Sequence, residues 1–389
     1  MTSRKYSIMM VAGEASGDTH AAKLALALKE KVGDDDLELY GSAGPRMRDA
    51  GVVPIVRSDE LSIVGLLEIG RALPMFWKTF KKLKAAAIER KPDLVILVDF
   101  PDFNLKLAKS LKKRGVKVVY YISPQVWAWR KYRTKALSRD VDLILTILPF
   151  EEAWYREQGI THVEYVGNPL ARDVIPSQSK EQFCLQHGLD ASRPIVALLP
   201  GSRHKEIVRI LPTLLETGAV MSQRDPLIQF IIPFAREKHR AELEAASFSV
   251  PKAWETIKNR TSIVFNETID ALSVADVAAV TSGTATLETG IIGTPMAIVY
   301  RSSAINYRLL RPLIDVSHFG LINLIADERV ANEYIQDDLN PMTLAAELFR
   351  LVKPEVNSEV RDRLKKATDN LGKGGASTRA ADAILGLIS

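Results

Sequence analysis

The stretch MMVAGEASGDTHAA, residues 9–22, decides how the chain begins to fold. Its apolar start completes YSIMMVA, a β-strand pattern over residues 6–12, and its alanine-rich end predicts a helix from about Thr19. Gly13 and Gly17 permit a tight turn between strand and helix. The turn lacks the GxGxxG spacing of dinucleotide-binding proteins and has Glu14 in place of the second glycine. We therefore expect a Rossmann-like unit that binds no nicotinamide cofactor.

Composition narrows the class of protein. A chain of 389 residues that is 47% apolar is more than one compact core usually holds, so two domains are expected. The net charge of +5 suits anionic ligands or a membrane surface but does not indicate nucleic acid. The single cysteine excludes an internal disulfide, and the six histidines show no metal-ligand spacing, so we expect no metal and no cofactor.

The N-terminal apolar run stops at Gly13 and reads as a first strand rather than a signal peptide. No stretch approaches the roughly 20 apolar residues that span a bilayer. These features predict a cytoplasmic protein that is soluble or peripherally bound to a membrane.

Short apolar runs alternate with amphipathic segments along the chain, which predicts an α/β fold with parallel strands. After residues 6–12, strands are expected in 93–100, 116–123, 142–148, 194–202, 227–234, 261–266, 276–285 and 294–300. The pattern restarts after a polar, proline-bearing stretch, which predicts two Rossmann-like domains facing a cleft, over residues 1–170 and 171–353. Residues 354–389 read as C-terminal helices that pack across the domains or onto a partner chain in a homodimer.

Ligands of such sheets bind beyond the carboxyl ends of the strands. At the first such end, Ser16 or Asp18 is expected to cap the following helix, whereas Glu14 has no capping role. At a second end, Asp99 follows a buried strand and is expected to act as a base with a raised pKa. Asp102 is expected to cap the helix that begins near Asn104.

Two further turns read as anion sites in the second domain. Gly201, Ser202 and Arg203 combine backbone amides at a helix start with a guanidinium, which suits a phosphate. Ser282, Gly283 and Thr284 open another helix that could hold a diphosphate. Glu288, one turn further, suits the vicinal hydroxyls of a ribose. The alternative for each turn is an ordinary helix start that binds no ligand.

The segment VGLLEIGRALPMFWKTFKKLKAAA, residues 64–87, has an apolar helical face opposite basic residues. It is either a core helix or a helix that lies on an anionic bilayer or lines an acyl-chain groove. On the second reading, the residues that would contact the membrane are Leu66, Leu73, Phe76, Trp77 and Phe80.

Eight stretches in this order resemble the lipid A disaccharide synthase family across nearly the full length. They are VAGEASGD at 11–18, AGPRM at 43–47, DFPDFN at 99–104, SPQVWAWR at 123–130, LPFE at 148–151, LLPGSR at 198–203, SGTATLE at 282–288 and NLIA at 323–326.

The resemblance implies an inverting glycosyltransferase of GT-B fold that works without a metal. Its donor would be UDP-2,3-diacylglucosamine and its acceptor 2,3-diacylglucosamine 1-phosphate, at the cytoplasmic face of the inner membrane. The product would be a β-1,6-linked disaccharide. By resemblance, Asp99 is the general base, Glu14 an essential acidic residue beside it, and Arg203, Glu288 and Asn323 belong to the nucleotide-sugar site.

Two positions depart from the family pattern. Asn168 stands where histidine is usual, and Ile322 stands where proline is usual before Asn323. Two rival functions also remain open. A UDP-sugar epimerase would share the two-domain architecture and the Gly283 turn. A non-catalytic lipid carrier would keep the helix over residues 66–83 but have no use for Asp99 or Glu288.

Overall fold

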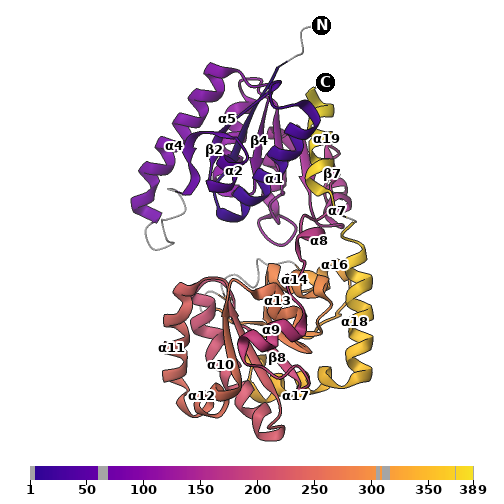
Figure 1. Ribbon diagram of the computed structural model, residues 1–389. Coiled ribbons are helices and arrows are strands. Elements are labelled where there is room, and N and C mark those ends of the chain that lie inside the picture. The colour runs from indigo at the N-terminus through magenta and orange to yellow at the C-terminus, as the bar shows by residue number, and fades with distance from the viewer. Residues whose placement is uncertain (1–4, 60–68, 304–306, 309–315, 373, 389) are drawn as a thin grey trace. The chain divides into compact units, whose positions relative to one another are not determined.

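The computed structural model describes most of the chain (Figure 1). The described residues are 5–59, 69–303, 307–308, 316–372 and 374–388. No helix among them is long and apolar enough to cross a membrane.

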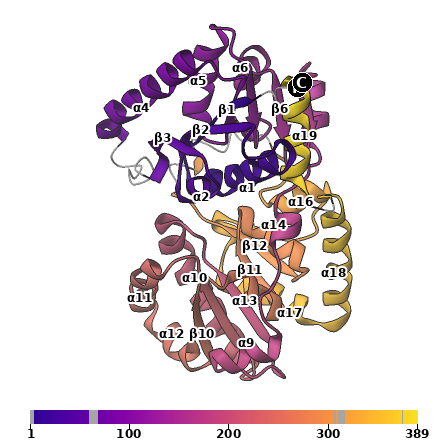
Figure 2. The same ribbon diagram turned by 45° about the horizontal axis from the view of Figure 1, so that its top comes forward.

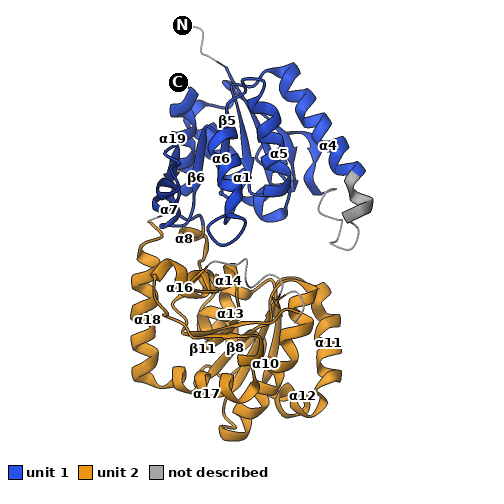
Figure 3. Cartoon of the chain, turned by 180° about the vertical axis from the view of Figure 1, so that it is seen from behind, with its two compact units in different colours: residues 1–169, 373–389 blue, residues 170–372 orange. Residues whose placement is uncertain are grey.

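The chain forms two compact units, shown in different colours in Figure 3. One consists of Met1–Pro169 and Lys373–Ser389, and the other of Leu170–Gly372, so the division falls one residue before the expected boundary at 170/171. The C-terminal segment does not stay together: α18 (Pro354–Asp369) belongs to the second unit and α19 (Ala376–Ile388) to the first.

The first unit contains a seven-stranded sheet whose strands all run parallel. Its central strands are continuous apolar runs because helices cover both faces. In sheet order the strands are β3 (Val53–Arg57), β2 (Leu37–Ala43), β1 (Tyr6–Ala12), β4 (Leu94–Val98), β5 (Val118–Tyr121), β6 (Leu143–Thr146) and β7 (Val163–Tyr165).

The register of these strands aligns the turns that follow them. Ala12 pairs with Val98, and Val98 pairs with Tyr121, so β1, β4 and β5 end side by side. The residues that directly follow β1, β4 and β5 therefore lie at the same edge of the sheet.

Helices around this sheet include one from the far end of the chain. Figure 2 shows α19 beside α1, and its Arg379 donates to the carbonyl of Val166 at 2.8 Å. The helices are α1 (Ala15–Val32), α2 (Pro45–Asp49), α4 (Ile69–Arg90), α5 (Pro101–Lys112), α6 (Thr134–Asp140), α7 (Glu151–Glu157) and α19, with a 3-10 turn η2 at Lys131–Arg133.

The second unit contains a six-stranded parallel sheet. Its order is β10 (Thr261–Phe265), β9 (Gln229–Phe234), β8 (Ile195–Leu199), β11 (Val277–Thr281), β12 (Met296–Tyr300) and β13 (Glu333–Ile335). Its helices are α8 (Leu170–Asp173), α9 (Lys180–His187), α10 (His204–Arg224), α11 (Arg240–Ser249), α12 (Pro251–Ile257), α13 (Thr268–Val274), α14 (Thr284–Ile292), α16 (Leu321–Ala326), α17 (Pro341–Val352) and α18. Its described residues also form the 3-10 turns η3 (Glu237–His239), η4 (Lys258–Arg260) and η6 (Gln336–Asp338).

Every strand expected from the sequence is present, and the α/β prediction is confirmed. The capping prediction at the first turn was wrong. Glu14 occupies the N-cap position of α1 and makes no side-chain cap hydrogen bond. Asp18 is buried and instead accepts hydrogen bonds from the backbone amides of Gly44 (2.8 Å), Arg46 (2.9 Å) and Met47 (3.2 Å) at the start of α2. Asp18 therefore ties the first turn to the segment after β2.

Replacing Asp18 by alanine should destabilise the first unit. The change leaves backbone N–H groups buried without an acceptor, which should cost roughly 2 to 4 kcal/mol of unfolding free energy. Urea denaturation followed by circular dichroism measures this cost. The exposed Asp35→Ala is the matched control and should stay within about 0.5 kcal/mol of the wild type. Equal stabilities of the two variants would contradict the capping role.

Candidate functional site

Glu14 and Asp99 lie at the carboxyl edge of the first sheet, after the neighbouring strands β1 and β4. The Glu14 side chain is exposed, whereas Asp99 is half-buried. Burial raises the pKa of the Asp99 carboxyl above its ordinary value, and the negative charge of Glu14 raises it further. The structure thus brings the two predicted catalytic carboxylates together and makes Asp99 a stronger base than an ordinary aspartate.

The backbone at Asp99 is unusual. Asp99 and the next residue, Phe100, both adopt left-handed conformations, with φ of 47° and 50°. For a residue with a Cβ atom, the left-handed conformation costs roughly 1 to 2 kcal/mol relative to the right-handed one. Two fully buried side chains hold the turn: Asn104 Nδ2 and Tyr120 OH donate to the Asp99 carbonyl at 2.7 and 2.6 Å. The core of the unit therefore fixes the backbone from which the Asp99 side chain projects.

Aromatic rings cover the turn. Phe100 lies so close to Gly13 that a Cβ there would come within 2.3 Å of Phe100 Cδ1, so only glycine fits. The Phe100 ring stacks on Phe103 with centroids 5.5 Å apart, and Phe76 of α4 lies 6.1 Å from Phe100. These rings form an aromatic cluster next to the turn that carries Asp99.

The helix proposed to contact a membrane divides between core and surface. Phe76 and Phe80 are half-buried against Phe103, at centroid distances of 6.5 and 6.0 Å. Trp77 is 62% exposed, and Lys81 Nζ lies 3.5 Å from its ring centroid. Leu66, and the side chain of Leu73, lie outside the described residues.

The expected capping role of Asp102 was also wrong. The helix α5 begins at Pro101, before the expected start, and the residue at its N-cap position is Phe100. The Asp102 carboxylate instead pairs with Arg130 Nη1 at 3.1 Å and with Arg133 Nη2. Ser16 lies exposed in the first turn of α1.

Sequence reasoning gave no role to Glu151, which lies in the LPFE stretch. Its fully buried carboxylate accepts from Trp127 Nε1 at 3.0 Å and from the backbone amides of Ile147 and Leu148 at 3.2 and 3.0 Å. Burial raises the pKa of Glu151 to about 7. Asn168, also buried, donates to the Ile147 carbonyl at 3.1 Å, so this departure from the family pattern sits in the same polar cluster.

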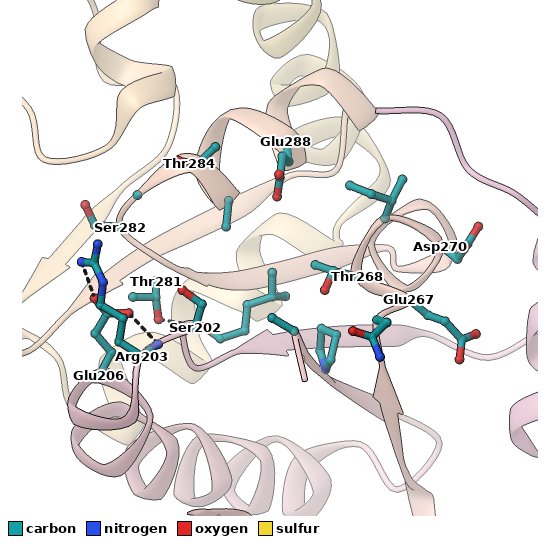
Figure 4. Close-up of a pocket in the computed structure, with 18 residues that line it drawn as sticks. Ser202, Arg203, Glu206, Glu267, Thr268, Asp270, Thr281, Ser282, Thr284 and Glu288 are labelled. Carbon is teal, nitrogen blue, oxygen red and sulfur yellow. Dashed lines mark hydrogen bonds and ion pairs between the residues drawn. The ribbon is translucent and has the colours of Figure 1, made fainter. Parts of the chain in front are cut away.

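A cavity of about 560 Å³ opens at the carboxyl edge of the second sheet (Figure 4). Most of the predicted nucleotide-sugar residues line it: Gly201, Ser202, Arg203, Ser282, Gly283, Thr284 and Glu288. They come from the turns after β8 and β11, which are neighbours in the sheet. The two predicted anion sites thus form one cavity.

The backbone of both turns suits an anion. Gly201 and Gly283 have φ of 108° and 149°, which only glycine adopts readily, and they lead into the N-termini of α10 and α14. The free amides and the dipole of a helix start attract phosphate oxygens. Glu206 accepts from the backbone amide of Arg203 and pairs with its guanidinium, both at 3.3 Å, which orders the turn. The Arg203 side chain remains 81% exposed and can reach a ligand.

Glu288 points from α14 toward the interior of the cavity, with Ser202 and Thr268 across from it (Figure 4). Burial raises the pKa of its carboxyl. A carboxylate in this setting accepts hydrogen bonds from two adjacent hydroxyls, the arrangement that a ribose offers.

The lining also includes residues that the sequence did not single out. Asn266 follows β10 in a left-handed conformation with φ of 60°, and Thr268 begins α13. The rule that ligand-binding residues follow strands could have found both. Asp270 turns away and accepts from the amide and hydroxyl of Ser177 at 2.6 and 2.9 Å, so its contacts are structural.

Asn323 is not among the lining residues. Its buried amide donates to the Ala331 carbonyl at 2.7 Å and to Glu333 Oε1 at 2.9 Å, and accepts from the Ala331 amide at 2.9 Å. The structure therefore gives it a role in holding α16. The neighbouring departure, Ile322, is buried against Gly290 of α14, where a Cβ would come within 2.6 Å of Ile322 Cδ1.

No group of three or more metal-ligating side chains is placed to hold a metal ion within the described residues. The groups in the second unit that could bind an anion include the N-termini of α10 and α14 and the side chain of Arg203.

Solved structures share this fold at low sequence identity. A putative UDP-N-acetylglucosamine 2-epimerase from Listeria monocytogenes superposes with a TM-score of 0.65 at 12% identity, covering 98% of this chain and 96% of that one. A glycosyltransferase from Rickettsia africae gives 0.62 at 12%, covering 99% and 98%. The S. aureus MnaA–UDP co-structure gives 0.64 at 13%, covering 97% and 96%. These likenesses establish the fold, two Rossmann-like domains of the GT-B class.

Sequence relatives are much closer. The lipid-A-disaccharide synthetase family model matches residues 8–384. The lipid-A-disaccharide synthase of Trichlorobacter lovleyi is 40% identical over 387 residues, 99% of this chain and 98% of that protein. That of Geobacter metallireducens is 41% identical over 383 residues, with 98% and 97% covered. On these matches and on the site just described, the chain belongs to the lipid-A-disaccharide synthase family of glycosyltransferases.

Proposed function

We propose that this chain transfers 2,3-diacylglucosamine from its UDP derivative to the 6-hydroxyl of 2,3-diacylglucosamine 1-phosphate. The products are the β-1,6-linked disaccharide 1-phosphate and UDP. Membership of the family supports the overall reaction. The observation that carries the mechanism is the placement of Asp99, a half-buried carboxylate of raised pKa in a rigid turn beside Glu14.

Asp99 acts as the general base. Its carboxylate takes the proton of the acceptor 6-hydroxyl while that oxygen attacks the anomeric carbon of the donor sugar. The bond between the anomeric carbon and the diphosphate oxygen breaks, and UDP leaves with the electron pair. A single displacement of this kind inverts the anomeric configuration.

The second unit stabilises the departing UDP. Arg203 and the N-terminal amides of α14 neutralise the charge that develops on the diphosphate, and Glu288 binds the ribose hydroxyls. Release of UDP tests this function against its rivals. A transferase releases UDP only when donor and acceptor are both present, whereas an epimerase returns an altered monosaccharide without an acceptor and a carrier releases nothing.

Asp99→Asn should lower kcat by about 10² to 10⁴, because the amide keeps the shape of the carboxylate but cannot accept the proton. UDP affinity should change little, since the nucleotide site belongs to the other unit. The measurement is UDP release with both substrates saturating. Asp382→Asn, on α19 where the carboxylate pairs with Lys31, is the control and should turn over normally. Near-normal turnover of Asp99→Asn would remove Asp99 from the reaction.

The pH profile of the wild type sharpens this test. Activity should fall as the pH drops through the raised pKa of Asp99, because the protonated carboxyl cannot act as a base. Glu14→Gln removes a negative charge that raises this pKa, so the acidic limb should move to lower pH in the residual activity of the variant. An unmoved limb would assign it to another group.

Glu288→Gln should weaken UDP binding by roughly 1 to 3 kcal/mol, the range for a hydrogen bond to a charged group. Isothermal titration calorimetry measures the change. The exposed Glu244→Gln on α11 removes the same charge from the same unit and should bind UDP as the wild type does. Identical affinities of all three proteins would exclude Glu288 from the nucleotide site.

The substrates are lipids, and we propose that α4 brings the first unit to the membrane surface. Exposed Trp77 and its neighbours Lys78 and Lys81 combine an interfacial aromatic ring with positive charge. Phe76 and Phe80 pack against Phe103 and contribute less to membrane contact.

Trp77→Ser should therefore reduce binding to anionic vesicles several-fold in a sedimentation assay while leaving the thermal midpoint unchanged, because the exposed ring packs little against the core. Phe248→Ser, which removes an aromatic ring that is 84% exposed on α11, is the matched control and should bind as the wild type does. Equal binding of both variants and the wild type would argue against α4 as the membrane contact.

A further inference from the structure

Two arginines converge on one carboxylate three residues after Asp99. Arg130 and Arg133 both pair with Asp102, Arg130 at 3.1 Å. The Arg133 side chain is only 9% exposed, whereas Arg130 is 35% exposed. Two guanidinium groups against one carboxylate leave a net positive charge, so the cluster can still bind an anion.

This cluster adjoins the turn that carries the base. Arg133 is close enough to Tyr120 for its charge to oppose the rise that burial causes in the pKa of the phenol. Tyr120 in turn donates to the Asp99 carbonyl at 2.6 Å. Asp102 is the second residue of α5, the helix that begins directly after Phe100. The base and the arginines therefore share one edge of the sheet.

Arg130 is held in place by its surroundings rather than left free in solvent. Its backbone is left-handed, with φ of 58°, and its guanidinium carbon lies 4.1 Å from the Trp129 ring centroid. Trp127, three residues before Arg130, anchors the same loop, because its indole nitrogen donates to the buried carboxylate of Glu151 at 3.0 Å.

Backbone strain gathers at the same place. Among described non-glycine residues of the first unit, the left-handed conformations are Lys91, Asp99, Phe100, Ile122 and Arg130. All but Lys91 lie in the turns after β4 and β5. Strained backbone of this kind concentrates at functional sites, where the surrounding structure maintains it.

We propose that Arg130 binds the 1-phosphate of the acceptor sugar, with Arg133 and Asp102 as positioning residues that hold it. This inference rests on the proposed function. A guanidinium has five N–H donors, and the hydrogen bond that Arg130 makes to Asp102 uses one nitrogen, Nη1. A phosphate can take a bidentate pair of hydrogen bonds from a guanidinium. The acceptor carries its phosphate on C1 and its 6-hydroxyl on the substituent of C5, and both carbons are bonded to the ring oxygen. A site for the phosphate must therefore lie near the base.

The test compares two acceptors, 2,3-diacylglucosamine 1-phosphate and the same lipid without its phosphate. UDP release is measured in neutral detergent micelles, where no anionic lipid surface is present. We expect the wild type to prefer the phosphorylated acceptor in kcat/KM. Arg130→Gln should lower that preference by about 10- to 100-fold, chiefly through KM for the phosphorylated acceptor. Arg130→Lys keeps the charge but loses the planar fork, and should fall between the two.

Arg139→Gln is the matched control because it removes a cation from α6 that pairs with Asp140 instead of Asp102. It should keep the full preference. Equal loss on both acceptors in Arg130→Gln would overturn the inference and make Arg130 a residue that only shapes the loop. The inference would also be overturned if the wild type showed no preference for the phosphorylated acceptor in micelles. The same holds if that preference appeared only on anionic vesicles. Failure of the wild type to release UDP with both substrates would instead refute the proposed function itself.

Discussion

The carbonyl oxygen of Asp99 is the point on which the first unit's site depends. Two buried donors, Asn104 and Tyr120, hold this oxygen and keep two successive residues in a left-handed conformation. Because the turn is fixed, the Phe100 ring lies against Gly13. The burial of Asp99, together with the charge of Glu14, raises the pKa of its carboxyl toward that of a useful base.

The second unit differs from the first in the charge of the groups that line its proposed site. We propose that its cavity holds a group that is already charged, for which it offers backbone amides at two helix starts and one exposed arginine. Glycines at 201 and 283 allow the chain to enter each helix with its amides directed at the cavity. Glu206 orders the first of these turns, so the amides are arranged before a ligand arrives.

The two departures from the family pattern are accommodated by packing. Ile322 fills the space beside Gly290 on the helix that begins at the cavity, and Asn168 joins the buried polar cluster around Glu151. Asn323, by contrast, has all its described contacts within the protein, which explains why it does not line the cavity.

The sequence by itself determined the two parallel sheets, since long apolar runs buried on both faces are visible in local patterning. It also placed Glu14, Asp99 and the two anion-binding turns, because residues after such strands share one edge. The strands β2, β3, β7 and β13, which lie at or next to the sheet edges, were not expected, because their apolar patterns are either brief or mixed with polar residues. Only the tertiary structure decided that Asp18 caps α2 and that Asp102 pairs with arginines some thirty positions away. It also showed that the charge of Glu14 acts on Asp99. Those contacts join residues that are distant in the chain, and local periodicity carries no information about which distant partner a polar side chain will meet.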